Sequence, residues 1–512
     1  MMAGYVDMGQ YGDFNMGKKP WWGYRSTMDS SGNGHLHGLH WAVPLLRTGT
    51  QTGNQAMVDR FLTIVKSWLK RYPLNKNNRP GSAKVGIVAG ERLWALTCAA
   101  EAAPDSWLPK RARQEAKAEI RRFRIKADTN NVALHSQMGA MAVLCAQRGK
   151  DATDQPRDHL KRLANYLVLP DGSDREGSPH YAYYTRTLLT GALRIFEVCG
   201  GPGKGELRAA IQRSEPFLAM ATKPDFFLVT LGDTARSKLA ASRFDAASPT
   251  LFAASEGRYG TPPTSTYRAY QGGYLFGRAG SSPNSLFYSI RTSRGPSPTA
   301  HSHNDVGSVT FQSDGVEWLG DPGPYRYSYG SAMRRHVVSR AAHNAISAEP
   351  LPPKKAKKRK KWRAPRASPS GRLKSAQQTG ALDRTCVQDR TYPTLKIRRC
   401  VEVDRESQTF IVTDKIKAKA KTRFTQRWQI PPGVTVAKTG SGATLSADGA
   451  EQALSLSGTT AAKVQLRRAK ASHARGWFTG SYGERLPGVQ LSRALKLKKS
   501  EKVIWTTTIR PT

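Results

Sequence analysis

The sequence predicts an all-α half followed by an all-β half, because the spacing of its apolar residues changes along the chain. From about residue 35 to 245 apolar residues recur at i, i+3, i+4 and i+7, and after about residue 265 they alternate with a period of two. A stretch between the halves, 246–264, is rich in Ala, Ser, Gly and Pro and is predicted to be a linker. A chain of 512 residues is long enough for two domains with separate cores.

The helical half, 35–245, shows several amphipathic segments that end at Pro, Gly or Asp. Helices are expected at 58–69, around 92–96, and at 111–126, 131–147, 156–167, 180–198 and 205–221. Helix pairs joined by such loops are typical of a bundle or an α/α toroid, and no fixed-length repeat indicates a solenoid. Residues 1–34 are predicted to be an N-terminal extension.

The second half, 265–512, contains short alternating runs at the spacing of an antiparallel β-sandwich. Strands are expected at 274–277, 285–290, 308–311, 409–413 and 503–509. A cleft between the two halves is the default position for a ligand site.

Charge is the second strong feature of the chain. Lys and Arg total 80 against 38 Asp and Glu, a formal net charge of +42. Such an excess attracts polyanions over a range set by salt, and nucleic acid, anionic membrane and acidic polysaccharide all fit it. A dense basic run lies in a predicted insertion, 352–374, where repulsion between like charges excludes a packed strand. We expect a surface insertion there rather than a specific binding element.

The five cysteines are too few for a disulfide scaffold. Cys98, Cys145 and Cys199 lie in apolar helical surroundings and are interpreted as small core residues. Cys386 and Cys400 flank one hairpin, so pairing stays open, although two free thiols are favoured.

Several classes of protein lack support in the sequence. No apolar run reaches about 18 residues, so a membrane span is not expected. Residues 1–20 have no apolar segment of a secretory signal. A phosphate loop, a dinucleotide fingerprint and a Gly-x-Ser-x-Gly elbow are also missing. Paired carboxylates for glycoside hydrolysis stay open, but none form an obvious pair.

Imidazoles and carboxylates recur where strand-like runs end: His301, His303, Asp305, Asp321 and His343. Neutral imidazole and carboxylate are usual zinc ligands, and ligands from separate strands converge only if the sheet brings them together. Histidines at strand ends can instead cap backbone groups, but a set of this size favours a functional site.

Polar residues also mark the start of one predicted helix. Asn131 and His135 are four residues apart and share a face, from which an amide can bond a substrate carboxyl group. The alternative is that Asn130 or Asp128 only caps the helix, and this motif taken alone favours that interpretation.

A third polar group follows the turn at 169–178. This turn carries Arg175 and Glu176 and leads into a helix that begins with His180 and three tyrosines, Tyr181, Tyr183 and Tyr184. Packing in a core explains one or two of these aromatic rings but not the whole group.

An ordered set of motifs resembles the C-terminal module of heparinase II/III-type polysaccharide lyases: His301-x-His303-x-Asp305, Asp321-Pro-Gly-x-Tyr325, Arg334-Arg335 and His343-Asn344. The Asn130-Asn131 segment and the turn from Asp171 to Tyr181 resemble stretches of that family's helical domain. The motifs cover about residues 35–350, and the later strands match by pattern only.

The resemblance implies an N-terminal (α/α) toroid followed by a C-terminal antiparallel β-sandwich, and an enzyme that cleaves a uronate-containing acidic polysaccharide by β-elimination. Its implied catalytic residues are Asn131, which would neutralise the uronate carboxyl group, and Tyr181 with His301. Some relatives have a His directly after this Asn, where this chain has Val132, and His135 is the candidate to replace it.

The resemblance also implies a structural divalent metal, usually zinc, with His303, Asp321 and His343 as ligands. Substrate contacts are expected from Asn130, His135, Arg175, Glu176, His180, Tyr325 and Arg334. A periplasmic or secreted location is favoured by the family.

Two other functions compete with a lyase. A non-catalytic protein of the same fold could bind anionic glycans in surface-polysaccharide assembly. Nucleic-acid binding through the basic run ranks last, because it leaves the His/Asp/Tyr set unexplained.

Overall fold

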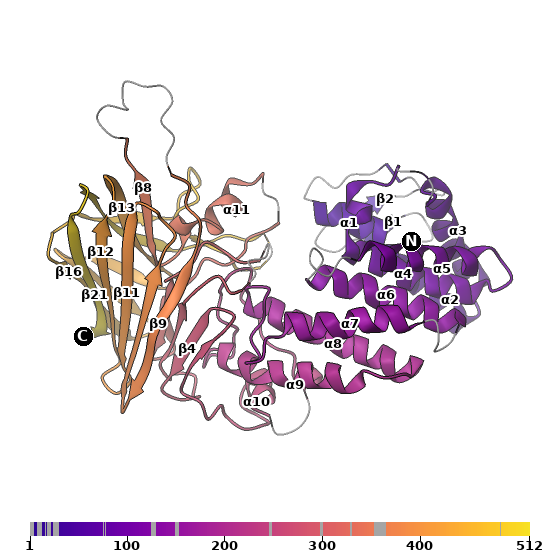
Figure 1. Ribbon diagram of the computed structural model, residues 1–512, viewed down its shortest axis with the longest axis horizontal. Helices are drawn as coiled ribbons and strands as arrows, with labels where there is room; N and C mark the ends of the chain where they lie inside the picture. The colour runs from indigo at the N-terminus through magenta and orange to yellow at the C-terminus, as the bar shows by residue number, and fades with distance from the viewer. Residues whose placement is uncertain are drawn as a thin grey trace. The chain divides into compact units, whose positions relative to one another are not determined.

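The computed structural model describes most of the chain (Figure 1). The described residues are 5–7, 13–15, 17, 22–23, 30–74, 76, 78–123, 130–148, 153–244, 248–296, 301–327, 330–352, 365–481 and 483–512. Most of the predicted basic run, at 353–364, lies outside them.

The chain divides into two compact units. The first comprises Met1–Val168 and Tyr184–Gln212, and the second comprises Leu169–Tyr183 and Arg213–Thr512. Residues 213–244 of the predicted helical half thus belong to the second unit, and so does helix α10 (Pro249–Ala254), which lies in the predicted linker.

The first unit is helical. Its α-helices are α1 (Ser30–Gly38), α2 (Val43–Thr52), α3 (Gln55–Arg71), α4 (Gly86–Ala102), α5 (Leu108–Arg122), α6 (Asn131–Arg148), α7 (Asp154–Leu167), the larger part of α8 (Pro179–Cys199) and the first half of α9 (Lys204–Ala221). Short 3-10 helices lie at His40–Ala42 and Gly81–Lys84, and β1 (Tyr5–Asp7) pairs with β2 (Asp13–Asn15). The apolar faces that predicted the helices are the buried ones, as in α3, where Phe61, Val65 and Trp68 are at most 1% exposed.

The second unit is built on antiparallel sheets (Figure 1). A five-stranded sheet has the order β3-β4-β5-β6-β7, from β3 (Tyr267–Tyr270), β4 (Tyr274–Arg278), β5 (Phe287–Arg291), β6 (Val309–Ser313) and β7 (Val316–Leu319). A four-stranded sheet has the order β17-β20-β13-β8, from β17 (Val464–Arg468), β20 (Val489–Leu497), β13 (Thr422–Ile430) and β8 (Ile346–Pro350).

An eight-stranded sheet has the order β14-β15-β16-β21-β12-β11-β10-β9, from β14 (Thr435–Lys438), β15 (Gly442–Ala447), β16 (Ala450–Gly458), β21 (Lys502–Pro511), β12 (Thr409–Ala418), β11 (Leu395–Asp404), β10 (Leu382–Asp389) and β9 (Gly371–Thr379). Short β18 (Trp477–Phe478) pairs with β19 (Leu486–Pro487), and α11 (Ala332–Val337) and a 3-10 helix, Arg340–Ala342, follow β7. One buried cluster joins the three larger sheets through residues such as Trp318, Phe410 and Trp428. The predicted order of a helical part and then an antiparallel β part is confirmed.

The cysteine predictions were wrong at two points. Cys145 in α6 and Cys199 at the end of α8 form a disulfide, so they are not free core thiols. Cys386 and Cys400 also form one, because they face each other directly across the β10–β11 pair. Cys98 remains a free thiol. No helix among the described residues is long and apolar enough to cross a membrane.

Each disulfide is expected to contribute measurably to stability. Closing the Cys145–Cys199 loop, with a sequence separation of 54, restricts the unfolded chain by about 4 kcal/mol in the chain-entropy model. The Cys386–Cys400 loop has a separation of 14, and its closure is worth about 3 kcal/mol. We expect paired Cys→Ala variants to lower the free energy of unfolding in that order in urea titrations. A Cys98→Ala variant is the control, and an equal loss from it would contradict the prediction.

Candidate active site

The structure brings two of the predicted catalytic residues together within the second unit. Tyr181 lies in the first turn of α8, and His301 lies in the loop between β5 and β6. Their rings stack with centroids 3.4 Å apart and an interplanar angle of 15°. Both side chains are partly exposed, so a ligand can reach them.

Two glycines allow the backbone segments that carry this pair to approach. Gly177 has φ 79°, and a Cβ there would lie 2.0 Å from the Ser302 hydroxyl oxygen. Gly232 has φ 56°, and a Cβ there would lie 2.4 Å from the Gly177 carbonyl oxygen and 2.6 Å from that of His301. Any larger residue at either position would push apart the turn before α8, the loop at Gly232 and the loop of His301.

Asp233 is the centre of the polar contacts behind the stacked rings. Its Oδ2 lies 3.0 Å from His301 Nδ1, and its Oδ1 lies 2.8 Å from His303 Nε2. The Arg334 guanidinium donates to both oxygens, at 2.5 and 3.0 Å. Burial alone would raise the pKa of Asp233, but the hydrogen bonds from these partners hold it well below the usual range. Asp233 is therefore a permanent anion that orients both imidazoles.

Sequence reasoning missed Asp233, although a signal was present. The apolar run 226–231 ends directly in Gly232-Asp233, which is the same strand-end pattern that singled out His301. The structure shows why the position matters, because Thr234 beside it bonds the Ser178 hydroxyl and accepts from the His180 backbone N–H at the start of α8.

Arg334 was predicted to contact the substrate, but its position in the structure does not match this prediction. Its side chain is 0% exposed, and it is held by Asp233 and by the carbonyl oxygen of Pro324. A buried guanidinium in a bidentate pair with a carboxylate balances that charge and fixes its orientation. The geometry assigns Arg334 to support of Asp233.

Tyr327 is a second residue that sequence reasoning missed. Its hydroxyl shares a hydrogen bond of 2.6 Å with that of Tyr181, and its ring packs edge-on to His301. Burial and then the negative charge of Asp233 raise the pKa of Tyr327 far above its usual value. Tyr327 therefore stays protonated and can donate its hydroxyl proton to the Tyr181 oxygen.

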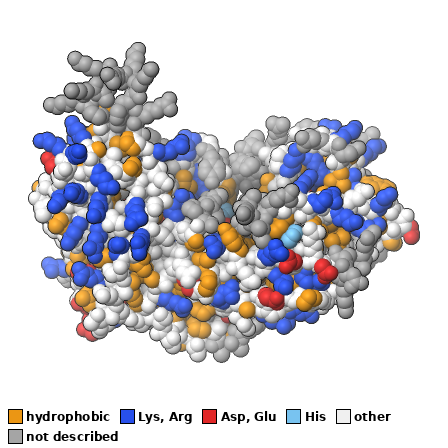
Figure 2. Space-filling view, in the orientation of Figure 1, with side chains coloured by type: hydrophobic (Ala, Val, Ile, Leu, Met, Phe, Trp, Pro, Cys, Tyr) orange, Lys and Arg blue, Asp and Glu red, His pale blue; other side chains and the backbone are white. Residues whose placement is uncertain are grey.

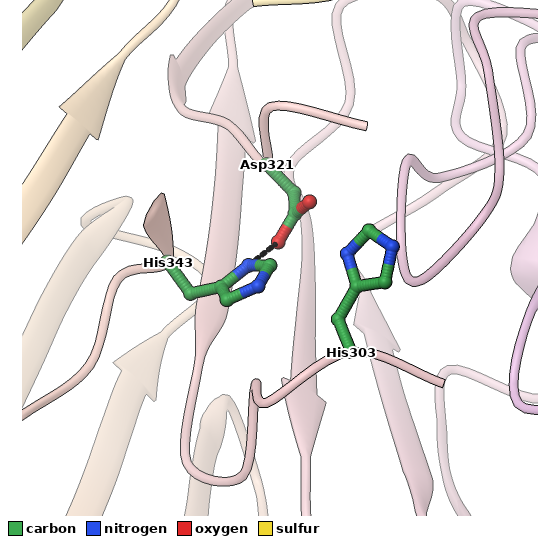
Figure 3. A group of neighbouring side chains, drawn as sticks. All are labelled: His303, Asp321 and His343. Atoms are coloured by element: carbon green, nitrogen blue, oxygen red, sulfur yellow. Dashed lines mark hydrogen bonds and ion pairs between the residues drawn. The ribbon is translucent and has the colours of Figure 1, made fainter. Parts of the chain in front are cut away.

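Three predicted metal ligands converge beside this network (Figure 3). One ligand atom from each of His303, Asp321 and His343 lies within 4.8 Å of the other two, and all three side chains are buried. Asp321 follows β7, His343 follows the 3-10 helix Arg340–Ala342, and His303 lies between β5 and β6, so three separate loops supply the group.

The polar atoms of this group fit a cation. His303 uses Nε2 on Asp233, while its Nδ1 is buried without a hydrogen-bond partner among the described residues and faces Asp321 and His343 in Figure 3. His343 uses Nδ1 on Asp321, at 2.7 Å, and its buried Nε2 likewise has no partner in the described part of the chain. Two imidazoles and a carboxylate are a common donor set for zinc, and a carboxylate behind a ligand imidazole is a usual support.

Asn344 is the last residue of the sequence motif, and its contacts show its role. Its amide donates to the carbonyl oxygens of Val309, at 2.7 Å, and Gly320, at 2.9 Å, and its Oδ1 accepts from the Gln429 N–H. It thereby joins β6, the end of β7 and β13 next to His343. Its role is to hold the loops of the metal group in register.

The other predicted substrate contacts in the second unit differ in exposure. Glu176 is 0% exposed and its Oε2 lies 3.7 Å from His301 Nε2, and Tyr325 is 9% exposed in a small apolar cluster. These two predictions do not match the geometry, because buried side chains support the site rather than line it. His180 and Arg175 are partly exposed, and the His180 ring packs edge-on to Tyr181. Burial and then the charge of His301 lower the pKa of His180.

The remaining predicted residues lie in the first unit. Asn130 caps α6, since its side chain accepts from the Ala133 N–H, and Asn131 is 1% exposed at the start of the helix. His135 Nε2 lies 2.5 Å from the Tyr184 hydroxyl oxygen. Their catalytic and substrate-binding roles remain predictions.

Comparison with known families gives one match. Residues 261–506 match the family model described as heparinase II/III-like, C-terminal. No curated protein matches the sequence.

Solved structures similar to this chain are polysaccharide lyases. A heparinase III crystal structure has a TM-score of 0.80 at 14% identity, covering 98% of this chain and 80% of that one. The heparan sulfate lyase of Pedobacter heparinus has a TM-score of 0.68 at 16% identity, covering 100% and 81%. The chondroitin AC lyase of Streptomyces coelicolor A3, solved with chondroitin sulphate, has a TM-score of 0.55 at 11% identity, covering 93% and 74%. These likenesses establish the fold and confirm the predicted fold class.

Proposed function

Because residues 261–506 belong to the heparinase II/III-like C-terminal family, we propose that the protein is a lyase that cleaves a uronate-containing acidic polysaccharide by β-elimination. The observation that carries the proposal is the stacked pair of Tyr181 and His301, with the Tyr181 hydroxyl bonded to Tyr327. Among the similar structures, one is a heparan sulfate lyase and another is a chondroitin AC lyase in complex with chondroitin sulphate, and a glycosaminoglycan is the substrate class that we infer.

Removal of the C5 proton requires a base, and Tyr181 is the proposed one. A free tyrosine has a pKa of about 10, so its phenolate needs support near neutral pH. Tyr327 supplies one donor, because it stays protonated, and the imidazole of His301 is stacked on the Tyr181 ring. The phenol formed by proton abstraction then returns a proton to the departing O4. His301 is proposed to assist one of these two proton transfers.

The C5 proton becomes acidic enough only if the neighbouring carboxylate is offset. Asn131 and His135 are the proposed groups, since an amide and an imidazole can bond a carboxylate.

A zinc ion held by His303, Asp321 and His343 would fix the loop of His301 rather than take part in proton transfer. Asp233 supports this interpretation, because it bonds the ring of His303 opposite the cation position and also orients His301.

Metal removal is expected to lower stability as well as activity. We expect about one zinc ion per purified chain, and a contribution to stability of about 4 kcal/mol when free zinc exceeds its Kd by about 1,000-fold. His343→Ala should lose the metal and lower the Tm, as measured by elemental analysis and calorimetry. His159→Ala, in the first unit, is the control and should keep the metal. Full metal content in His343→Ala would exclude this site.

The test of the function is a panel of acidic polysaccharides, with and without sulfate, followed by the ultraviolet absorbance of unsaturated uronate products. Heparan sulfate and chondroitin sulphate are the first substrates, and neutral dextran is the control. Tight binding of a glycan without any unsaturated product would favour a non-catalytic glycan-binding protein instead.

A further inference from the structure

Helix α5 of the first unit has an outer face with only basic charges. Its basic residues are Lys110, Arg111, Arg113, Lys117, Arg121 and Arg122. Its acids, Glu115 and Glu119, are 2% and 6% exposed and point inward. Lys and Arg side chains are spread over the surface seen in Figure 2, so charge alone does not mark a site. The shape and the ion pairs of α5 distinguish it.

Two adjoining hollows lie along this helix. One has a volume of about 500 Å³ and is lined by Leu74, Arg111, Gln114, Lys117 and Arg121. The other, of about 490 Å³, shares Leu74 and Arg121 and adds Ala118 and Arg122. We call them together the α5 groove. Each is large enough for a sugar unit with its charged substituent.

Buried acids hold part of the lining in place. Glu115 accepts two hydrogen bonds from Arg79, at 2.5 and 2.9 Å, and one from Arg111 Nη2, at 2.9 Å. Glu119 pairs with Arg122 at 2.6 Å. Burial opposes the ionisation of Glu115, but Arg79 and the neighbouring arginines lower its pKa, so its charge is committed to them. These acids fix guanidinium groups at the wall of the groove.

Lys117 has a different setting. It is exposed, and no ion pair involving it occurs among the described residues. Arg113 and Arg121 lie four residues before and after it, and like charges at this spacing destabilise a helix. A bound anion would remove this repulsion.

An exposed aromatic ring extends the same face. Trp107, at the N-cap of α5, is 49% exposed. The helical repeat places Trp107, Lys110, Gln114, Lys117 and Arg121 on one stripe. An indole face, an amide and a row of cations suit a sugar chain with acidic groups, whereas single-stranded nucleic acid is usually bound by several rings that stack successive bases.

We propose that the α5 groove is a second binding site for an acidic polysaccharide, in which Lys117, Arg121 and Arg111 take its carboxylate or sulfate groups. It contains none of the residues of the candidate active site. The proposal deepens the proposed function, on which it relies for the class of polymer.

The test measures binding of uncleaved heparan sulfate by calorimetry, in the Tyr181→Phe background to prevent turnover. The variant Lys117→Gln/Arg121→Gln should bind about three- to tenfold more weakly, and with a shallower dependence on salt. The matched control is Lys415→Gln/Lys417→Gln, which removes the same charge from two exposed positions on β12 and should change affinity less than twofold.

A second pair of variants tests the aromatic residue. Trp107→Ala should weaken binding of the same polymer, while Tyr259→Ala, which removes another exposed ring, should not. These changes lie on exposed side chains, so folding is expected to be preserved.

Three results would overturn the proposal. One is unchanged affinity in Lys117→Gln/Arg121→Gln. Another is an equal loss of affinity in the β12 control, which would indicate that only the net positive charge of the protein attracts the polymer. The third is tighter binding of a DNA duplex than of heparan sulfate, lost in the same variant. If no polysaccharide is cleaved but the groove variants still lose affinity, the proposed enzymatic function fails and the groove stands.

Discussion

Tyr181→Phe is expected to lower kcat by about 10²–10⁴-fold, the usual contribution of a positioned acid or base. The substitution removes only the hydroxyl that bonds Tyr327 and leaves the ring stacked on His301. Loss of that one hydrogen bond costs about 1 kcal/mol, so the Tm should change little. The measurement is the initial rate of unsaturated product formation on the best polysaccharide of the panel.

Tyr183→Phe is the matched control for this prediction. Tyr183 lies two residues further along α8, and its hydroxyl accepts from the Ala240 N–H rather than from the active-site group. We expect near-normal rates from it. Full activity in Tyr181→Phe would remove Tyr181 from the mechanism.

Asp233→Asn should reduce both activity and metal affinity. An amide of the same shape offers one oxygen and one donor group, whereas Asp233 accepts from His301, His303 and both terminal nitrogens of Arg334. At least one buried donor would then face another donor, and the arginine would lose its charge partner. Breaking a buried pair in this way costs about 3–5 kcal/mol of stability.

Two measurements, metal affinity and the pH profile of kcat, distinguish a loss of imidazole orientation from a general loss of stability. We expect metal affinity to fall about 10–100-fold, as for other residues that support ligand imidazoles. The pH profile of kcat should also shift, because the carboxylate no longer fixes the proton on Nδ1 of His301.

Glu115→Gln is the control for Asp233→Asn, because it weakens a comparable buried carboxylate–arginine pair in the first unit. It should lose stability but keep its metal and the shape of its pH profile. If Asp233→Asn also keeps both, Asp233 has only a structural role.

Much of the fold could be predicted from local patterns. The change of apolar period near residue 265 predicted helices and then antiparallel strands, since the repeat of buried residues reflects the geometry of a single element. The ordered motifs also named His303, Asp321 and His343 in advance, and the structure brings these side chains together.

Pairings across the chain could not be predicted in this way. Asp233 meets His301 across 68 residues and Arg334 across 101, and Cys145 meets Cys199 across 54. Spacing along one helix or strand carries no information on which distant element packs against it.

The sequence alone thus determined the class of each half and the types of residue available for chemistry. Only the tertiary structure decided that Arg334 and Glu176 are buried supports, that Asp233 links the two imidazoles, and that Tyr327 holds Tyr181. The physical reason is that burial and hydrogen-bond partners depend on contacts between segments far apart in the chain, which form only when the sheets and loops pack.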